Sequence, residues 1–205
     1  MCLRNKIVFF AHYKFNVWHD VYEPAEDSFL FAENLTLGEG ESVLDMGTGC
    51  GILGVIAAEK ASRVIAVDIN PSAVLCAKEN AKLNKAADKM DFVQGDLFAP
   101  IKSSAKFDLI LFNAPYLPSN SGEDERWLGL AWSGGENGRS IIDRFIYEAP
   151  KYLSMSGRVL LMQSTLSNVR KSLKIFTAMG FKTRVIAKLD LPFFESLMLF
   201  EARIF

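Results

Sequence analysis

The chain has 205 residues, a formal net charge of −1 and 50% hydrophobic residues. This length favours one domain over residues 1–205, and the apolar content is sufficient for a sizeable core. The near-neutral charge argues against a general attraction to nucleic acid or to an acidic membrane. No apolar stretch reaches the roughly twenty residues that a membrane helix needs.

The cysteines are odd in number and widely spaced, at Cys2, Cys50 and Cys76. No pair of them has the spacing of metal ligands, and His12 and His19 do not complete a ligand set. We therefore expect a protein of the reducing cytoplasm without a structural metal.

Short apolar runs alternate along the chain with stretches of helical periodicity. The hydrophobicity of the runs is nearly continuous, which is typical of strands covered on both faces in a parallel sheet. The alternating order predicts a doubly wound α/β fold with helices on both faces. Only "LPFFE" separates the last two runs, so we expect these to pair antiparallel at the end of the sheet. The seven predicted strands are 42–47, 63–69, 91–96, 107–113, 158–164, 182–190 and 196–204.

Several helices have recognisable ends. We predict that Asn70 is the N-cap of a helix whose first residue is Pro71. We predict that Gly180 is the C-terminal cap of a later helix. Apolar residues at helical spacing predict a further helix in 140–154. In "YEPAEDS", Pro24 is expected to be the first residue of a helix that carries acids in its first turn.

Two other segments are less regular. Residues 117–137 lack clear secondary structure but carry two of the three Trp, and loops of this length are usually functional or disordered. The basic cluster in "VRKSLK" (169–174), with Lys182, Arg184 and Lys188 beyond it, has the helix-like spacing of a solvated face, with a binding role as the alternative.

A glycine-rich turn follows the first predicted strand of the sheet. In "VLDMGTGCGILGV", Asp45 precedes Gly47, Gly49 and Gly51, which allow the backbone to approach a ligand closely. An acid at this place would repel a pyrophosphate but suits a ligand with a positive charge, such as an ammonium or a sulfonium group. The alternative is a tight strand–helix connection with no ligand.

The next two strands also end in acids. Asp68 lies about twenty residues past the glycine turn, where a carboxylate accepts hydrogen bonds from ribose hydroxyls. Asp96 is placed to accept from an adenine amino group, while the backbone N–H of Leu97 donates to a ring nitrogen. Each acid alone fits a solvated strand end or a helix cap, but three successive strand ends of this kind predict a nucleoside-containing ligand.

The fourth strand ends in "FDLILFNAPYLP". Asn113 places an amide at the strand end, Pro115 fixes φ and lacks an N–H, and Tyr116 offers a flat face for a planar amide or a base. A strand that ends in an ordinary turn is the alternative, because Asn followed closely by Pro is common in turns.

These four strand ends together resemble the class I S-adenosylmethionine-dependent methyltransferases. Within that class the chain is most similar to the HemK-type N5-glutamine methyltransferases, which modify peptide-chain release factors. The segments "VYEPAEDSFLFAENL" (21–35) and "LAWSGGENGRSIIDRF" (130–145) carry this narrower resemblance. The resemblance implies a Rossmann-like, seven-stranded, mostly parallel sheet with an antiparallel last strand. The chain has no room for the N-terminal helical domain of the bacterial members and resembles the compact archaeal and eukaryotic branch.

The resemblance also implies a cofactor, S-adenosyl-L-methionine, and the residues that bind it. The N-terminal segment 1–35 is expected to close over the cofactor, with Ser28 where the family has Thr; an ordinary capped helix is the alternative for this segment. The implied cofactor-binding residues are Tyr22, Glu26, Ser28, Asp45, Gly47, Thr48, Gly49, Gly51, Asp68, Ile69, Asp96, Leu97 and Asn113.

For the substrate, the resemblance implies that the Asn113 side-chain oxygen and the Ala114 carbonyl hold an amide NH₂, beside Pro115 and Tyr116. The family usually has Asn-Pro-Pro-Tyr here, and Ala114 replaces the first Pro while keeping its carbonyl. RNA adenine dimethyltransferases accept an apolar residue at this position. Trp132 is expected to wall the substrate pocket, with a structural role as the alternative.

The sequence therefore predicts methylation of the glutamine of a Gly-Gly-Gln motif in a release factor. The alternatives are an adenine-N6 methyltransferase acting on RNA or DNA, and a non-catalytic binding protein. The resemblance further implies a small zinc-binding activator subunit, for which the apolar run "KIVFFAHY" leaves room, although this run also suits a core or a self-dimer. Arg139 is expected either to cap the following helix or to contact the substrate backbone.

Overall fold

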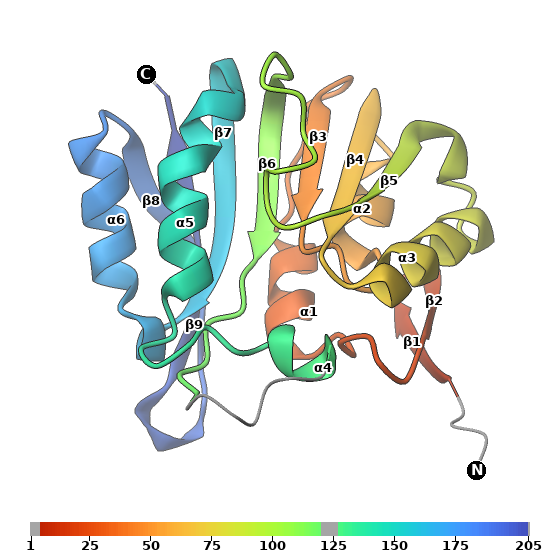
Figure 1. Cartoon of the computed structure of the whole chain (residues 1–205), viewed down its shortest axis with the longest axis horizontal. Coiled ribbons are helices and arrows are strands. Elements are labelled where there is room, and N and C mark those ends of the chain that lie inside the picture. Colours follow the sequence, from red (N-terminus) through yellow and green to blue (C-terminus); the bar gives the residue numbers. More distant parts are fainter. Residues whose placement is uncertain (1–4, 120–126, 205) are drawn as a thin grey trace.

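A seven-stranded sheet forms the centre of the computed structural model, which describes residues 5–119 and 127–204 (Figure 1). Cys2 and part of the predicted loop, 120–126, lie outside the described residues. The strand order is β5-β4-β3-β6-β7-β9-β8, and β9 runs antiparallel to both of its neighbours. The strands are β3 (Ser42–Met46), β4 (Arg63–Asp68), β5 (Met90–Gln94), β6 (Phe107–Asn113), β7 (Leu153–Ser164), β8 (Lys182–Asp190) and β9 (Ser196–Arg203).

This topology confirms the predicted Rossmann-like sheet, including its antiparallel last strand. Successive residues of each central strand point to opposite faces. In β6, Leu109 and Leu111 join the core on one face, while Ile110 and Phe112 join the core on the other. Burial on both faces explains why the strands read as continuous apolar runs.

Helices cover both faces, as predicted. Buried side chains of α1 (Glu26–Glu33), α2 (Ile52–Ala57) and α3 (Pro71–Leu83) pack on one face of the sheet. Those of α5 (Ser140–Glu148) and α6 (Val169–Ala178) pack on the other. A short helix, α4 (Trp127–Leu130), lies at the lower end of the molecule in Figure 1. None of the helices in the described ranges is both long and apolar enough to cross a membrane.

Two of the predicted helix ends are confirmed. The Asn70 side chain accepts a hydrogen bond from the Ser72 N–H at 2.9 Å, and Pro71 begins α3. Gly180 follows α6 with φ of 88°, and the N–H of Phe181 returns to the carbonyl of Phe176 at 3.0 Å, which forms a Schellman cap.

Two other boundaries were wrong. The helix in "YEPAEDS" begins at Glu26 rather than Pro24, because Ala25 is still extended with φ of −124°. The helix in 140–154 ends at Glu148, where Pro150 interrupts the hydrogen bonding and a 3₁₀ turn takes over.

The sequence did not predict a separate hairpin of β1 (Lys6–Phe10) and β2 (Tyr13–Val17). One face of this hairpin is buried against α3. Asn80 of α3 fixes its position, because the Asn80 amide exchanges hydrogen bonds with the backbone of Asn16 and also donates to the carbonyl of Cys50 at 2.9 Å. The hairpin is therefore tied to the glycine turn that follows β3.

Candidate active site

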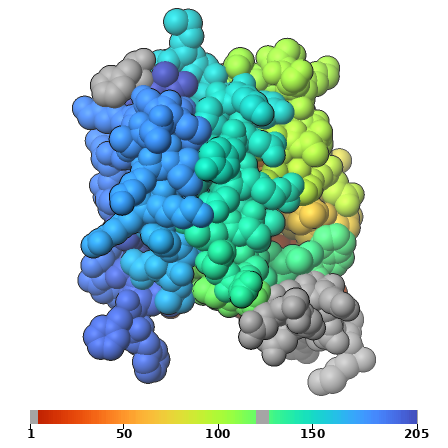
Figure 2. Space-filling model, turned by 60° about the vertical axis from the view of Figure 1, so that its left-hand side comes forward, coloured from red at the N-terminus to blue at the C-terminus, as the bar shows by residue number. Residues whose placement is uncertain are grey.

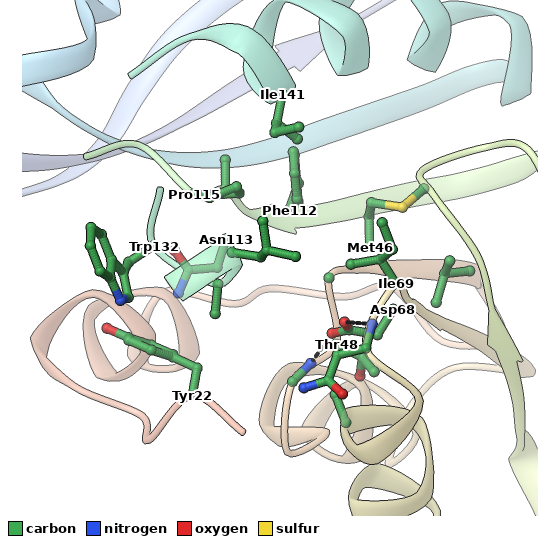
Figure 3. A pocket seen from close by; sticks show the side chains of 18 of the residues that line it. Tyr22, Met46, Thr48, Asp68, Ile69, Phe112, Asn113, Pro115, Trp132 and Ile141 are labelled. Carbon is green, nitrogen blue, oxygen red and sulfur yellow. Dashed lines mark hydrogen bonds between the residues drawn. The ribbon is translucent and has the colours of Figure 1, made fainter. Parts of the chain in front are cut away.

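A pocket of about 560 Å³ lies at the carboxyl ends of β3, β4 and β6 (Figure 3). Asn113, Tyr22 and Trp132 lie on one side of it in Figure 3, and Thr48 and Asp68 lie on the other. Crevices at this edge of doubly wound sheets are the usual ligand sites of the fold. The wall comes from the start of α1 and from residues 46–50, 67–70, 95–97, 112–117 and 130–133.

The glycine turn adopts the backbone that its sequence predicts. Gly47, Gly49 and Gly51 all have positive φ, at 65°, 56° and 89°. The pocket is lined by Gly47, Thr48 and Gly49. Gly51 does not line it and is the N-cap residue of α2. The turn therefore presents backbone, rather than bulky side chains, to a ligand.

Asp45 does not line the pocket but supports the turn from behind. Its side chain is 1% exposed, and its Oδ2 atom accepts hydrogen bonds from Thr48 Oγ1 at 2.5 Å and from the Gly54 N–H at 3.0 Å. These bonds join the end of β3 to the start of α2. The acid of the D-x-G-x-G-x-G pattern thus holds the turn in shape.

Burial also gives Asp45 a pH-dependent effect on stability. Burial raises the pKa of Asp45 to about 7, whereas an unfolded Asp titrates near ~3.9. The folded protein therefore retains a proton that the unfolded chain releases, so stability falls as the pH rises from about 4 to 7, by at most ~1.4 kcal/mol per pH unit.

We expect Asp45→Asn, which keeps an acceptor oxygen but cannot ionise, to remove this pH dependence. Thermal melting at pH 5 and pH 8 measures the effect. The melting temperature of the variant should gain on that of the wild-type protein as the pH rises. A difference that stays constant across this range would show that Asp45 does not titrate within it.

Asp68, at the end of β4, connects the glycine turn to α3. Its Oδ2 atom accepts from the Gly49 N–H at 2.9 Å and its Oδ1 atom from the Asn70 N–H at 2.9 Å. Burial raises the pKa of Asp68, while these two N–H groups act in the opposite direction. Each carboxylate oxygen keeps a further lone pair for hydroxyl groups in the pocket.

The end of β5 presents Asp96 and Leu97 to the same pocket. Arg144 of α5 donates to Asp96 Oδ2 at 2.7 Å, in an ion pair that is partly exposed. Leu97 has a left-handed backbone with φ of 47° and a buried side chain. The Asp96 Oδ2 atom is thus bound to Arg144 of α5, whereas its Oδ1 atom takes no part in that hydrogen bond.

Asn113 ends β6 with its amide fixed in one orientation. Its Nδ2 atom donates to Ser28 Oγ of α1 at 3.2 Å. Its Oδ1 atom is buried and has no hydrogen-bond partner among the described residues. A buried acceptor without a partner is costly, so this oxygen is prepared for an N–H from a ligand. Ala114, Pro115 and Tyr116 follow it along the wall.

Asp27 is a site residue that the sequence analysis missed. Its carboxylate accepts hydrogen bonds from the Tyr22 hydroxyl at 3.2 Å and from the Tyr116 hydroxyl at 3.1 Å, and all three residues line the pocket. Burial, followed by the charge of Asp27, raises the pKa of both tyrosines, so both stay protonated. Glu26, which was predicted instead, lies outside the pocket wall.

The segment from Trp127 to Arg139 is joined to the chain that follows Asn113. The Leu117 N–H donates to the Trp132 carbonyl at 2.9 Å, and the Gly134 N–H donates to the Leu117 carbonyl at 2.8 Å. Trp132 is among the residues that line the pocket. The resemblance segment 130–145 thus forms part of the pocket wall beside Tyr116.

Arg139 has neither of its two expected roles. It occupies the N-cap position of α5, but its side chain makes no capping bond. The guanidinium is buried and donates to Asp143 Oδ1, to the carbonyls of Ser167 and Asn168 and to Ser172 Oγ. Arg139 therefore locks α5 to the start of α6 and does not face a substrate.

Comparisons with known proteins agree with this geometry. The family model "Methyltransferase small domain" matches residues 22–127. A protein of Methanocaldococcus jannaschii named as an N5-glutamine methyltransferase is 44% identical over 193 residues, covering 92% of this chain and 94% of that protein. The human methyltransferase HEMK2 is 33% identical over 186 residues, covering 85% of this chain and 86% of that protein.

Among solved structures, the E. cuniculi Mtq2–Trm112 complex has a chain that superposes with a TM-score of 0.71 at 23% identity, covering 91% of this chain and 99% of the other. That complex is described as responsible for methylation of the translation termination factor eRF1. At this identity the superposition shows a shared fold. On the family model and the sequence relatives, the chain is a methyltransferase and belongs to the HemK-type N5-glutamine methyltransferase family.

Proposed function

We propose that the pocket binds S-adenosyl-L-methionine. Its volume lies within the range of small-molecule sites, and its donors and acceptors suit the parts of this molecule. Asp68 would accept from the ribose hydroxyls, Asp96 and the Leu97 N–H would hold the adenine, and the exposed Ile69 would pack on the ring. The backbone of Gly47, Thr48 and Gly49 would enclose the amino-acid end. When bound, the cofactor supplies an electrophilic methyl group.

The acceptor is proposed to be the side-chain amide of glutamine. An amide nitrogen is a weak nucleophile because its lone pair is delocalised, so orientation supplies much of the catalysis. The Asn113 Oδ1 atom and the Ala114 carbonyl would accept from the two N–H groups and aim the nitrogen. The proton is lost to solvent from the nitrogen after it has been methylated, so no residue needs to act as a base first.

One observation carries this proposal: the Asn113 amide is held by Ser28 through its nitrogen, while its oxygen has no partner in the described structure. Because Asn113 Nδ2 is bonded to Ser28, Asn113 Oδ1 is the atom that would accept a hydrogen bond from the substrate. The same bond, together with the Tyr116–Asp27 bond, joins α1 to the end of β6. These contacts support our proposal that segment 1–35 closes over the cofactor within one domain of residues 1–205.

The substrate is proposed to be the Gly-Gly-Gln motif of a release factor in the cytoplasm. One relative is named as an N5-glutamine methyltransferase, and the Mtq2–Trm112 complex is described as responsible for methylation of a termination factor. A side-chain amide also matches the acceptor geometry at Asn113. Adenine offers the same NH₂ group, but the net charge of −1 provides no electrostatic attraction to RNA.

We also propose a small zinc-binding activator subunit as a partner. The solved structure of Mtq2, which shares this fold, contains Trm112 as a second chain. On β1, Ile7 is 54% exposed and Phe9 is 67% exposed, which leaves apolar surface for a partner on the hairpin. The edge strand β5 offers unpaired backbone groups on the same side of the molecule.

The test is a methyl-transfer assay with labelled S-adenosylmethionine. Purified protein, with and without the activator, is given a release factor, the same factor with its Gly-Gly-Gln glutamine changed to alanine, and an RNA. We expect label on the intact factor and none on the altered factor. Label on the RNA alone would replace the glutamine substrate with the adenine alternative.

A further inference from the structure

The turn between β8 and β9 carries two exposed aromatic side chains. Phe193 is 97% exposed, and Phe194 is fully exposed beside it. The turn projects from the lower end of the molecule in Figure 1, and it stands clear of the surface as a blue projection in Figure 2. Neither ring takes part in the two core clusters, so the fold does not use them.

The backbone of this turn is unusual for the residues that it carries. Phe193 and Phe194 both have left-handed φ, at 62° and 64°, a conformation that favours Gly or Asn. Hydrogen bonds close the base of the turn, from the Leu191 N–H to the Glu195 carbonyl at 2.8 Å and from Ser196 Oγ to Asp190 at 2.6 Å. Strained backbone positions cluster at functional sites, so these two exposed aromatic residues are candidates for a binding role.

The turn stands at the same end of the sheet as the pocket. Strand β8 runs parallel to β6. Asp190, the last residue of β8, therefore lies at the same end of the sheet as Asn113, the last residue of β6. Leu191 packs against the same core cluster as Tyr116.

The charges around the tip argue against a polyanionic partner. Between residues 188 and 195 there are one lysine and two acids, and Lys188 is paired with Asp190 at 2.6 Å. Glu195, next to Phe194, has no such ion pair among the described residues. A surface that binds RNA or an anionic membrane through aromatics would add free basic groups beside them.

We propose that Phe193 and Phe194 form a docking finger for the folded protein substrate, whose apolar surface beside the glutamine loop receives the two rings while the glutamine enters the pocket. This inference rests on the proposed function. The finger would increase the affinity for the protein substrate through contacts away from the reacting atoms, as a small aromatic hot spot does. It would therefore favour a protein substrate over free glutamine, which cannot make these contacts.

The test uses the double variant Phe193→Asn and Phe194→Gly, which removes both rings and keeps residues that tolerate left-handed φ. With the activator present and the intact release factor as substrate, we expect the KM for the factor to rise about tenfold or more. We expect kcat, the cofactor Kd and the melting temperature to stay near their wild-type values. Met155→Ser is the matched control, because Met155 is 94% exposed at the opposite end of the sheet.

An unchanged KM for the factor would overturn the finger. A fall in kcat without a rise in KM would also overturn it, because the turn would then act on the pocket instead of on docking. If the wild-type protein transfers no methyl group to the factor, the proposed function itself fails, and the finger fails with it. If the wild-type protein methylates the factor and the double variant has the same KM as the wild-type protein, the docking finger is refuted while the proposed function stands.

Discussion

Asn113→Ala should lower kcat by about 100- to 1,000-fold, the range found when one preorganised polar group is removed from an active site. The reason is that the oxygen proposed to hold the substrate amide is lost, along with its orientation toward the methyl group. The Kd for S-adenosylmethionine should change by no more than a few-fold. Single-turnover kinetics and calorimetry measure the two quantities separately.

Ser28→Ala is the matched control for this change. It removes the 3.2 Å bond that anchors Asn113 Nδ2 but keeps the acceptor oxygen, so the loss of kcat should be much smaller. If Asn113→Ala weakened cofactor binding as strongly as it slowed turnover, the amide would belong to the cofactor site and the assignment of Asn113 to the substrate would be wrong.

Gly138→Ala should disable the protein through the backbone of Tyr116. Gly138 has φ of 69°, and a Cβ atom there would overlap the carbonyl oxygen of Tyr116. Either Tyr116 or the 127–139 segment must move, which disturbs the pocket wall. We expect a loss of roughly 1–3 kcal/mol of stability from the left-handed backbone alone, a further loss from the overlap, and a fall of about 100-fold in kcat/KM.

Gly180→Ala separates backbone strain from this steric effect. Gly180 has φ of 88°, but no atom lies within 4 Å of a Cβ built there. This control should lose stability and keep its kcat/KM. Equal activity in the two alanine variants, measured beside their thermal melting, would mean that the contact between Gly138 and Tyr116 is not needed for catalysis.

The features that the sequence predicted well are set by short stretches of chain. The continuous apolar runs follow from burial on both faces of the sheet, the cap at Asn70 from its own side chain, and the turn after β3 from glycines at positive φ. Each depends on residues within about ten positions of one another, so the pattern can be read without the fold.

The features that were missed depend on distant contacts. The Tyr116–Asp27 bond joins residues 89 positions apart, and nothing near Asp27 in the sequence marks it as the shared acceptor of two tyrosines. Arg139 is buried against the start of α6 and the residues before it, and its hydrogen-bond acceptors there lie 28 to 33 positions later in the chain. The β1–β2 hairpin has one exposed face, so its apolar run was ambiguous between core and surface.

Ala114 shows how the structure explains a departure from the family pattern. The family usually has Pro at this position, and the Ala114 side chain is 3% exposed and packs in the core beneath α5. Ala114 is also one of the residues that line the pocket. The packing of Ala114 and the bonds from Leu117 to the 132–134 segment can hold the backbone in place of the missing proline ring.

The most direct test of the account is a crystal structure of the protein with S-adenosylhomocysteine and a Gly-Gly-Gln peptide. We predict that the glutamine Nε2 atom donates to Asn113 Oδ1 at about 2.9 Å, and that the same nitrogen faces the cofactor sulfur. A glutamine amide bound elsewhere in the pocket, with Asn113 Oδ1 still lacking a donor, would contradict the proposed mechanism.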